Sequence, residues 1–269
     1  MTYAMNETVT LSKDGHIAEV TLNRPEKYNA LSPAVFEGLA AAGEAVRADP
    51  EIRAVVLAGA GKNFCAGLDL QSFSSGGFDR DAFRDKALNL AEGEIANPLQ
   101  KPVYVWKEVQ VPVIAAIQGV TYGGGTQVAL GADFRIAAPD TRMSVMEIKW
   151  GLIPDMGLTT VLPRLTRMDV AKDLILTGRV VGAEEARDLG LITRIADDPL
   201  AAAREAAADI AARSPDAIRG GKALIEETWS ASPAEALRRE AELQVEIMGQ
   251  PNQIEAVMAN MQKRAPNFS

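Results

Sequence analysis

Residues 111–127 read VPVIAAIQGVTYGGGTQ, and they decide the architecture that the sequence predicts. Val111 to Gln118 is a short apolar run rich in β-branched residues, which is typical of a strand buried on both faces. Gly123 to Gly125 follow it, and from Thr126 to Ala132 the spacing becomes helical. Three glycines in a row lose much backbone entropy on folding. They favour a turn where main-chain N–H groups approach negative charge, although a simple strand-to-helix turn is the alternative.

The same arrangement occurs earlier in the chain. Ile52 to Ala58 is an apolar, β-branched run, and residues 63–70, which read NFCAGLDL, follow it closely. Two N–H donors from two such loops can form an oxyanion hole, in which the loss of one donor costs on the order of 10²–10³ in rate.

The rest of the first 195 residues continues the alternation of strands and helices. Val9 to Ser12 and Ile17 to Asn23 flank a turn signal and predict a hairpin. Pro33 opens a helical pattern, and Phe134 to Ala137 is expected to be a strand. Strands that alternate with helices predict an α/β architecture.

The chain after Pro199 is predicted to be wholly helical. Three segments there carry apolar residues at helical spacing, namely Ala201 to Arg213, Pro233 to Met248 and Asn252 to Lys263. We place a boundary near Ile195, which divides the chain into an α/β core (residues 1–195) and a helical region (residues 196–269). The segment from Phe73 to Gln100, with Ser74 to Gly77 at its start, is expected to be mobile and exposed.

Composition opposes several classes of function. The 269 residues carry a formal net charge of −8, which argues against a nucleic-acid partner because phosphate binding needs a basic face. Apolar runs are of strand length rather than about 20 residues, so no membrane span is expected. Met1 to Thr10 lacks the pattern of a secretory leader, and we expect a cytoplasmic protein. Cys65 is the single cysteine, so neither an internal disulfide nor a zinc or other metal site is expected.

Several motifs together resemble those of the crotonase (enoyl-CoA hydratase/isomerase) superfamily. They keep that family's order and spacing from about residue 8 to the C-terminus and comprise FCAGLD (64–69) with GGG (123–125), LNRP (22–25) with NAL (29–31), PVIAAIQG (112–119), GLIP (151–154), LTG (176–178), AEEA (183–186) and GL (190–191). The resemblance implies a core of repeated ββα turns and a C-terminal helical trimerisation region. It also implies homotrimers, which often pair into hexamers.

The substrate that the resemblance implies is an acyl-CoA thioester. Its carbonyl oxygen would be held in an oxyanion hole by the backbone N–H groups of Leu68 and Gly124. Coenzyme A is then part of the substrate, and no separate cofactor is expected.

The resemblance also implies a set of CoA-binding residues. Those that would lie near the CoA phosphates are the cations Arg24, Lys27 and Lys263, the last of them at times across a subunit interface. Those that would line the adenine and pantetheine path are Ala66, Asp69 and Leu70. For each cation, a solvated surface charge is the alternative.

The acids decide which reaction is expected. Hydratases of the family use two glutamates, and these positions correspond here to Gln127 and Glu147. Gln127 cannot act as an acid or base at neutral pH, although it can orient water or substrate. Asp155 matches a position that is acidic in the dienoyl-CoA isomerase branch. The alternatives are that Glu147 is a surface carboxylate paired with Lys149, and that Asp155 caps a helix over Met156 to Leu162.

Migration of a carbon–carbon double bond is favoured over hydration. One carboxylate, or a Glu/Asp pair across the acyl chain, is sufficient to take a proton from one carbon and return it to another. The prediction assigns this role to Glu147, with Asp155 and Gln127 as further candidate catalytic residues. Hydration by one glutamate remains open, as does a relative that binds acyl-CoA without turnover.

Overall fold

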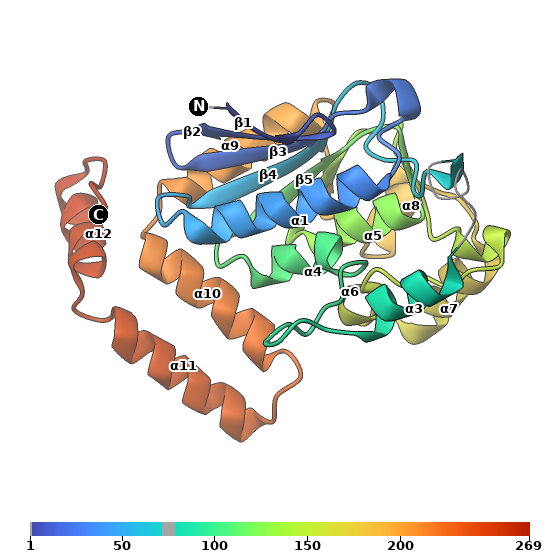
Figure 1. Cartoon of the computed structure of the whole chain (residues 1–269). Coiled ribbons are helices and arrows are strands. Elements are labelled where there is room, and N and C mark those ends of the chain that lie inside the picture. Colours follow the sequence, from blue (N-terminus) through green and yellow to red (C-terminus); the bar gives the residue numbers. More distant parts are fainter. Residues whose placement is uncertain (1, 72–78) are drawn as a thin grey trace.

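A seven-stranded sheet forms the centre of the protein in the computed structural model, which describes residues 2–71 and 79–269 (Figure 1). The strand order is β1-β2-β3-β4-β5-β7-β10. The bounds of these strands are Thr2–Asn6 (β1), Val9–Asp14 (β2), Ile17–Leu22 (β3), Ala54–Gly59 (β4), Val113–Ile117 (β5), Phe134–Ala137 (β7) and Arg194–Ile195 (β10). Strands β1 to β3 pair antiparallel, and the sheet is parallel from β3 to β10. The predicted hairpin and α/β architecture are therefore confirmed.

The central strands β4 and β5 are buried along their whole length. Successive side chains of a strand point to opposite faces, so each of these strands contributes to two apolar layers. Val55 and Leu57 belong to the larger core, whereas Ala54, Val56 and Ala58 belong to the smaller one on the other face. The long apolar runs of the sequence arise because both faces of the sheet are covered.

Helix α9 (Pro199–Ala211) covers the face with the smaller core (Figure 1). Ala203 and Ala207 lie four residues apart, hence on one side of the helix, and both are fully buried against the sheet. Small side chains on the helix and on β4 let the two backbones approach closely. The helical region thus begins with a helix that packs on the sheet, and the division near Ile195 stays a prediction.

The opposite face of the sheet is covered by helices α1 (Pro33–Ala48), α4 (Lys101–Glu108) and α5 (Gly124–Gly131). Helices α1 and α4 pack closely, since a Cβ built on Gly43 would lie 2.3 Å from Cγ2 of Val105. Trp106 is fully buried in this layer, and its indole N–H donates to the carbonyl oxygen of Pro102 at 3.0 Å. Helix α5 packs against α4 in this layer.

A small second sheet begins directly before the glycine triplet and was not predicted. Its order is β6-β8-β9, with bounds Val120–Tyr122, Arg142–Ser144 and Val181–Gly182. Strands of two or three residues are too short to show a period of two in the sequence. The remaining elements before α9 are η1 (Pro25–Lys27), η2 (Glu147–Trp150), α6 (Leu158–Leu165), α7 (Met168–Thr177) and α8 (Ala183–Asp188).

Helix α3 (Arg80–Leu88) lies in the described part of the segment that was expected to be exposed. It has no buried residue, and Asp79 caps its start by accepting hydrogen bonds from the amides of Asp81 and Ala82. The glycine-serine stretch Ser74 to Gly77 lies outside the described residues.

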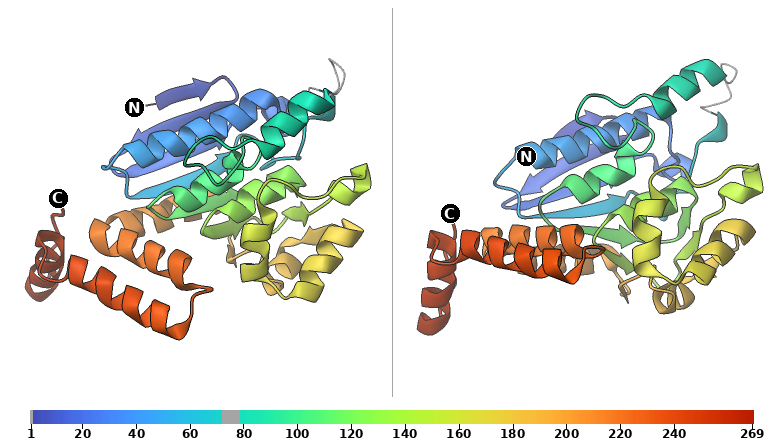
Figure 2. Two further views of the ribbon diagram at one scale, coloured as in Figure 1. Left: turned by 60° about the horizontal axis from the view of Figure 1, so that its bottom comes forward. Right: turned by 90° about the horizontal axis from the view of Figure 1, so that it is seen from below.

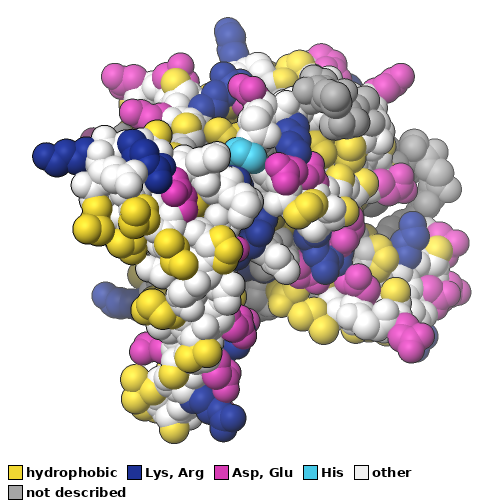
Figure 3. Space-filling view, turned by 90° about the vertical axis from the view of Figure 1, so that its left-hand side faces the viewer, with side chains coloured by type: hydrophobic (Ala, Val, Ile, Leu, Met, Phe, Trp, Pro, Cys, Tyr) yellow, Lys and Arg dark blue, Asp and Glu magenta, His cyan; other side chains and the backbone are white. Residues whose placement is uncertain are grey.

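The C-terminal helices α10 (Pro215–Thr228), α11 (Pro233–Ile247) and α12 (Pro251–Gln262) extend away from the sheet (Figures 1 and 2). Helix α10 is anchored by Lys222, whose side chain is only 7% exposed and whose ammonium group donates to the carbonyls of Trp106 and Val111 and to Asp133 at 2.8 Å. Figure 3 faces this end of the molecule and shows apolar side chains gathered over the C-terminal helices. Among the helices of residues 2–71 and 79–269, none is long and apolar enough to cross a membrane.

Candidate active site

The loop after β4 is tied to two other segments by backbone hydrogen bonds. The N–H of Cys65 donates to the carbonyl of Val120 in β6 at 3.1 Å, and the carbonyl of Cys65 accepts from the N–H of Tyr122 at 2.9 Å. On the other side, Leu31 donates to the carbonyl of Gly67 at 2.8 Å and accepts from the N–H of Asp69 at 3.0 Å, so its two partners flank Leu68. Because its two neighbours face Leu31, the N–H group of Leu68 is directed to the opposite side. Leu68 itself is half-buried.

The glycine triplet lies directly against this loop. Gly123 has a φ of +53°, a left-handed conformation that favours glycine, and a Cβ built on Gly67 would lie 2.7 Å from the carbonyl oxygen of Tyr122. Gly124 is the first residue of α5, so its N–H has no partner within the helix. Within the described ranges, the N–H groups of Leu68 and Gly124 have no hydrogen-bond acceptor.

Glu147 lies beside the glycine triplet at the start of η2. Its Oε1 would be 3.6 Å from a Cβ built on Gly123, and it accepts a hydrogen bond of 2.7 Å from Nε2 of Gln127. The other oxygen, Oε2, is buried and has no hydrogen-bond partner among the residues that the structure describes. Burial raises the pKa of Glu147 and the negative charge of Asp155 adds to the rise, while hydrogen bonds from its own backbone and from Gln127 oppose it.

Gln127 is buried and uses both polar atoms of its side chain within the protein. Nε2 donates to Glu147, and Oε1 accepts from the backbone N–H of Met156 at 3.0 Å. The structure thus brings the two predicted residues Gln127 and Glu147 into direct contact. It also connects them to the loop of Met156, which sequence reasoning did not include in the site.

The two alternatives for the acids are wrong. Helix α6 begins at Leu158 after Gly157, which has a φ of +92°, and no side chain caps it, so Asp155 is not a helix cap. Lys149 lies over the ring of Trp150, 5.4 Å from its centroid, and the described part of the chain contains no ion pair between Lys149 and Glu147. Asp155 as a whole is exposed, yet crowding around its carboxyl group desolvates it and raises its pKa.

Two of the predicted CoA-binding residues contact each other. Arg24 donates to Asp69 at 3.0 Å and to the carbonyl oxygen of Ala30 at 2.7 Å, and both charged side chains are largely buried. The buried Asn29 braces the same region through hydrogen bonds to the carbonyls of Ala60 and Asn63. Arg24 therefore has a structural role that its residue type alone did not indicate, and its contact with phosphate stays a prediction.

The other predicted CoA-binding residues of the core are accessible. Lys27 and Leu70 are exposed, and Ala66 is half-buried at the rim of the same loop. Lys263 follows the end of α12 in a left-handed conformation rather than lying within the helix. Helix α12 lies at the opposite end of the molecule from α3 and α7 (Figure 1). A contact of Lys263 with the CoA phosphates stays a prediction.

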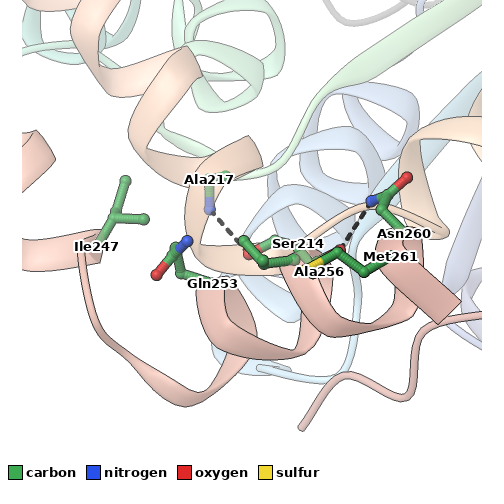
Figure 4. A pocket seen from close by; sticks show the side chains of 8 residues that line it. Ser214, Ala217, Ile247, Gln253, Ala256, Asn260 and Met261 are labelled. Carbon is green, nitrogen blue, oxygen red and sulfur yellow. Dashed lines mark hydrogen bonds between the residues drawn. The ribbon is translucent and has the colours of Figure 1, made fainter.

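A crevice of about 400 Å³ lies between the C-terminal helices (Figure 4). It is lined by Ser214, Ala217, Ile247, Gln253, Ala256, Val257, Asn260 and Met261. This lining includes no titratable side chain, so the crevice offers no acid or base. The region around Gly124 and Glu147 is the better candidate for chemistry.

Known proteins share this fold and this sequence pattern. The sequence matches the family described as Enoyl-CoA hydratase/isomerase over residues 12–269. It is 33% identical over 260 residues to the enoyl-CoA hydratase EchA19 of Mycobacterium tuberculosis, covering 96% of this chain and 95% of that protein. It is 37% identical to the (E)-benzylidenesuccinyl-CoA hydratase of Thauera aromatica, covering 80% of each. A crystal structure of enoyl-CoA hydratase from Bacillus anthracis superimposes with a TM-score of 0.88 at 30% identity, covering 97% of this chain and 98% of that one.

The mixed sheet with helices on both faces, which superimposes on a solved enoyl-CoA hydratase, defines a protein of crotonase fold. The chain belongs to the enoyl-CoA hydratase/isomerase family, whose members act on acyl-CoA thioesters.

Proposed function

We propose that this protein moves a carbon–carbon double bond of an enoyl- or dienoyl-CoA, with Glu147 as the acid/base. The carbonyl oxygen of the thioester would be held by the N–H groups of Leu68 and Gly124. The observation that carries the proposal is one half-buried carboxyl group with a free oxygen, beside two backbone amides that lack acceptors.

The reaction proceeds through an enolate of the thioester. Glu147 takes a proton from the carbon next to the carbonyl group of a 3-enoyl-CoA, and the electron pair of the broken C–H bond moves into the conjugated system. The negative charge collects on the carbonyl oxygen, where two N–H donors and the positive end of α5 stabilise it. Glu147 then returns the same proton to the carbon at the far end of the system, which gives a 2-enoyl-CoA.

The raised pKa of Glu147 suits this task. A carboxylate of ordinary pKa is a weak base for a carbon-bound proton, and burial makes the ionised form more basic. Acid/base catalysis of this kind contributes about 10²–10⁴-fold, which is comparable to the contribution of the oxyanion hole. Asp155 is the second carboxyl group near the site and would serve a dienoyl substrate, where protons leave and return at more distant carbons.

Hydration is a second candidate, and the names of the relatives favour it. In this case Glu147 takes a proton from water while the water oxygen bonds to the third carbon of a 2-enoyl-CoA, and then gives that proton to the second carbon. One carboxyl group acts twice, so protons balance. The glutamine at position 127 favours isomerisation, because it lacks the second carboxyl group that hydratases of this family use.

Assays on three substrate classes separate the alternatives. We expect the purified protein to convert 3-enoyl-CoA or 3,5-dienoyl-CoA, with slower hydration of 2-enoyl-CoA. Faster hydration than isomerisation would favour the second candidate. Binding of acyl-CoA in isothermal titration without turnover of any of the three would instead identify a non-catalytic binder and overturn the proposal.

We also propose that the C-terminal helices assemble the protein into homotrimers, or hexamers formed by two trimers. Apolar side chains of α11 and α12 that are exposed in one chain support this, namely Leu237, Val245, Ile254, Val257, Met258 and Met261. Single exposed apolar residues are normal on a protein surface, whereas several of them on neighbouring helices are typical of an interaction site. Sedimentation equilibrium is expected to give a mass of three or six chains, and a monomer at micromolar concentration would contradict the proposal.

A further inference from the structure

We propose that Gln127 is a positioning residue that assigns the exchangeable proton to one oxygen of Glu147 and holds this carboxyl group to the loop of Asp155. The proposal rests on the function proposed above. It gives Gln127 a role that requires no contact with substrate or water.

The orientation of the Gln127 amide follows from its partners. The backbone N–H of Met156 can only donate, so the atom that faces it at 3.0 Å is the carbonyl oxygen of the side chain. The NH₂ group must then face Glu147, where Nε2 lies 2.7 Å from Oε1. Both contacts are satisfied only in this orientation of the amide, which removes the usual ambiguity between its oxygen and nitrogen atoms.

This contact makes the two oxygens of Glu147 different from each other. Oε1 accepts a hydrogen bond from the side-chain amide of Gln127, so a proton on Oε1 would point at another donor. Oε2 is buried and has no partner in the described ranges. Buried polar atoms without partners are rare in folded proteins, and a catalytic role is a recognised reason for one. Oε2 is therefore the atom that exchanges the proton with the substrate, while Oε1 is the anchored one.

A glutamine serves this purpose better than a glutamate would. A carboxyl group at position 127 would lie in contact with Glu147, and two carboxylates so close cannot both ionise. The pair would share a proton and titrate in two coupled steps. With Gln127, the site has a single titrating group at this point and one defined proton position.

Few other charged groups act on Glu147. Asp155 is the one whose negative charge raises the pKa of Glu147, and Lys149 on the same element lies over Trp150 instead. Helix α7 packs against η2 and carries three charged residues. Asp169 is paired with Arg167 and Asp173 with Arg179, and the third is Lys172. Tyr122, directly before the glycine triplet, is a further titratable residue near the site.

The test replaces the amide by an apolar side chain of similar length. In Gln127→Met the anchor of Glu147 is lost together with a hydrogen bond to its ionised form. We expect kcat to fall about 10²-fold, as for a misplacement of about 1 Å, while KM changes by less than about threefold. The rising limb of kcat/KM against pH should move to higher pH, because the ionised carboxylate loses a donor.

Two further variants make the test specific. Gln118 donates to the carbonyl oxygen of Gly59 at the same distance of 2.7 Å but does not contact Glu147, so Gln118→Met controls for the loss of one such bond. It should retain the wild-type shape of the pH profile. Gln127→Glu should show two coupled ionisations in place of one and more hydratase activity relative to isomerase activity.

The outcomes separate this proposal from the proposed function. If Glu147→Gln abolishes turnover but Gln127→Met keeps the wild-type kcat and pH profile, the positioning role is wrong and the function stands. If Glu147→Gln retains full activity, the proposed function itself is wrong. A Gln127→Met protein that loses CoA affinity and kcat in equal measure, with an unchanged pH profile, would indicate a merely structural role and overturn the proposal.

Discussion

Replacing Glu147 by glutamine should separate chemistry from binding. The new side chain keeps the size of the old one, and its carbonyl oxygen can still accept the hydrogen bond from Gln127 that now measures 2.7 Å. Only the ability to take up and release a proton is lost. A general acid/base contributes about 10²–10⁴-fold, so we expect kcat to fall by at least this factor, which corresponds to about 3–5 kcal/mol of transition-state stabilisation.

The assay follows the absorbance of the conjugated thioester formed from 3-enoyl-CoA. Isothermal titration with a saturated acyl-CoA measures binding, and the Kd should change by less than about twofold because no CoA contact is altered. Glu205→Gln is a matched control, since Glu205 is an exposed residue of α9 and should leave kcat unchanged. Wild-type activity in Glu147→Gln would refute the catalytic assignment, as would a loss of activity caused only by weaker binding.

The same variant makes a prediction about folding stability. Burial raises the pKa of Glu147 in the folded protein, so the unfolded chain gives up this proton at lower pH than the folded one. The wild type therefore loses stability as the pH rises above the ordinary glutamate value, whereas the glutamine variant does not. Thermal unfolding should show the variant at least as stable as the wild type at pH 8. The Tm of the variant minus the Tm of the wild type should be larger at pH 8 than at pH 4. A smaller difference at pH 8 than at pH 4 would contradict the sign.

Further perturbations test other parts of the site. In the wild type, kcat/KM should rise with pH and reach half its maximum above the ordinary glutamate pKa, because Glu147 must be ionised and its pKa is raised by burial; a profile flat from pH 4 to 8 would contradict this. Gly124→Ala places a Cβ 2.7 Å from Cδ1 of Leu31, so we expect a loss of about 1–3 kcal/mol in urea unfolding and a fall in kcat, and unchanged values of both would argue against the close approach. Arg24→Met should lower the free energy of unfolding by about 1–3 kcal/mol, because it removes hydrogen bonds of a charged group, and an unchanged denaturation midpoint would show that these bonds are weak. Lys27→Met should leave stability unchanged and weaken CoA binding mainly at low salt, and an unchanged Kd would remove Lys27 from the site.

The main architecture could be predicted from the sequence because apolar, β-branched runs of this length are typical of strands buried on both faces of a sheet. The run at 52–58 covers all but the last residue of the buried strand β4, the run at 111–118 contains β5, and the glycines at 123–125 lead into α5. Strand β7 was predicted with its observed bounds of Phe134–Ala137. The second sheet was missed because its strands are too short to carry a pattern.

The contacts of the site were harder to predict, since they join residues distant in sequence. Gln127 was expected near Glu147, but nothing in the sequence shows that the backbone of Met156, 29 residues away, holds the other end of its amide. Arg24 was predicted as a cation for phosphate, and its ion pair with Asp69 joins positions 45 residues apart. Residue type indicates what a side chain can do, whereas partners of this kind depend on how the loops fold against each other.

The central claim is that two backbone amides from separate loops bind one thioester carbonyl. A crystal structure with an unreactive acyl-CoA analogue tests it most directly. The account predicts that the carbonyl oxygen lies about 2.7–3.1 Å from the backbone nitrogens of both Leu68 and Gly124, with Oε2 of Glu147 facing the carbon next to the carbonyl group. A thioester bound elsewhere, or an oxygen in contact with only one of the two amides, would contradict it.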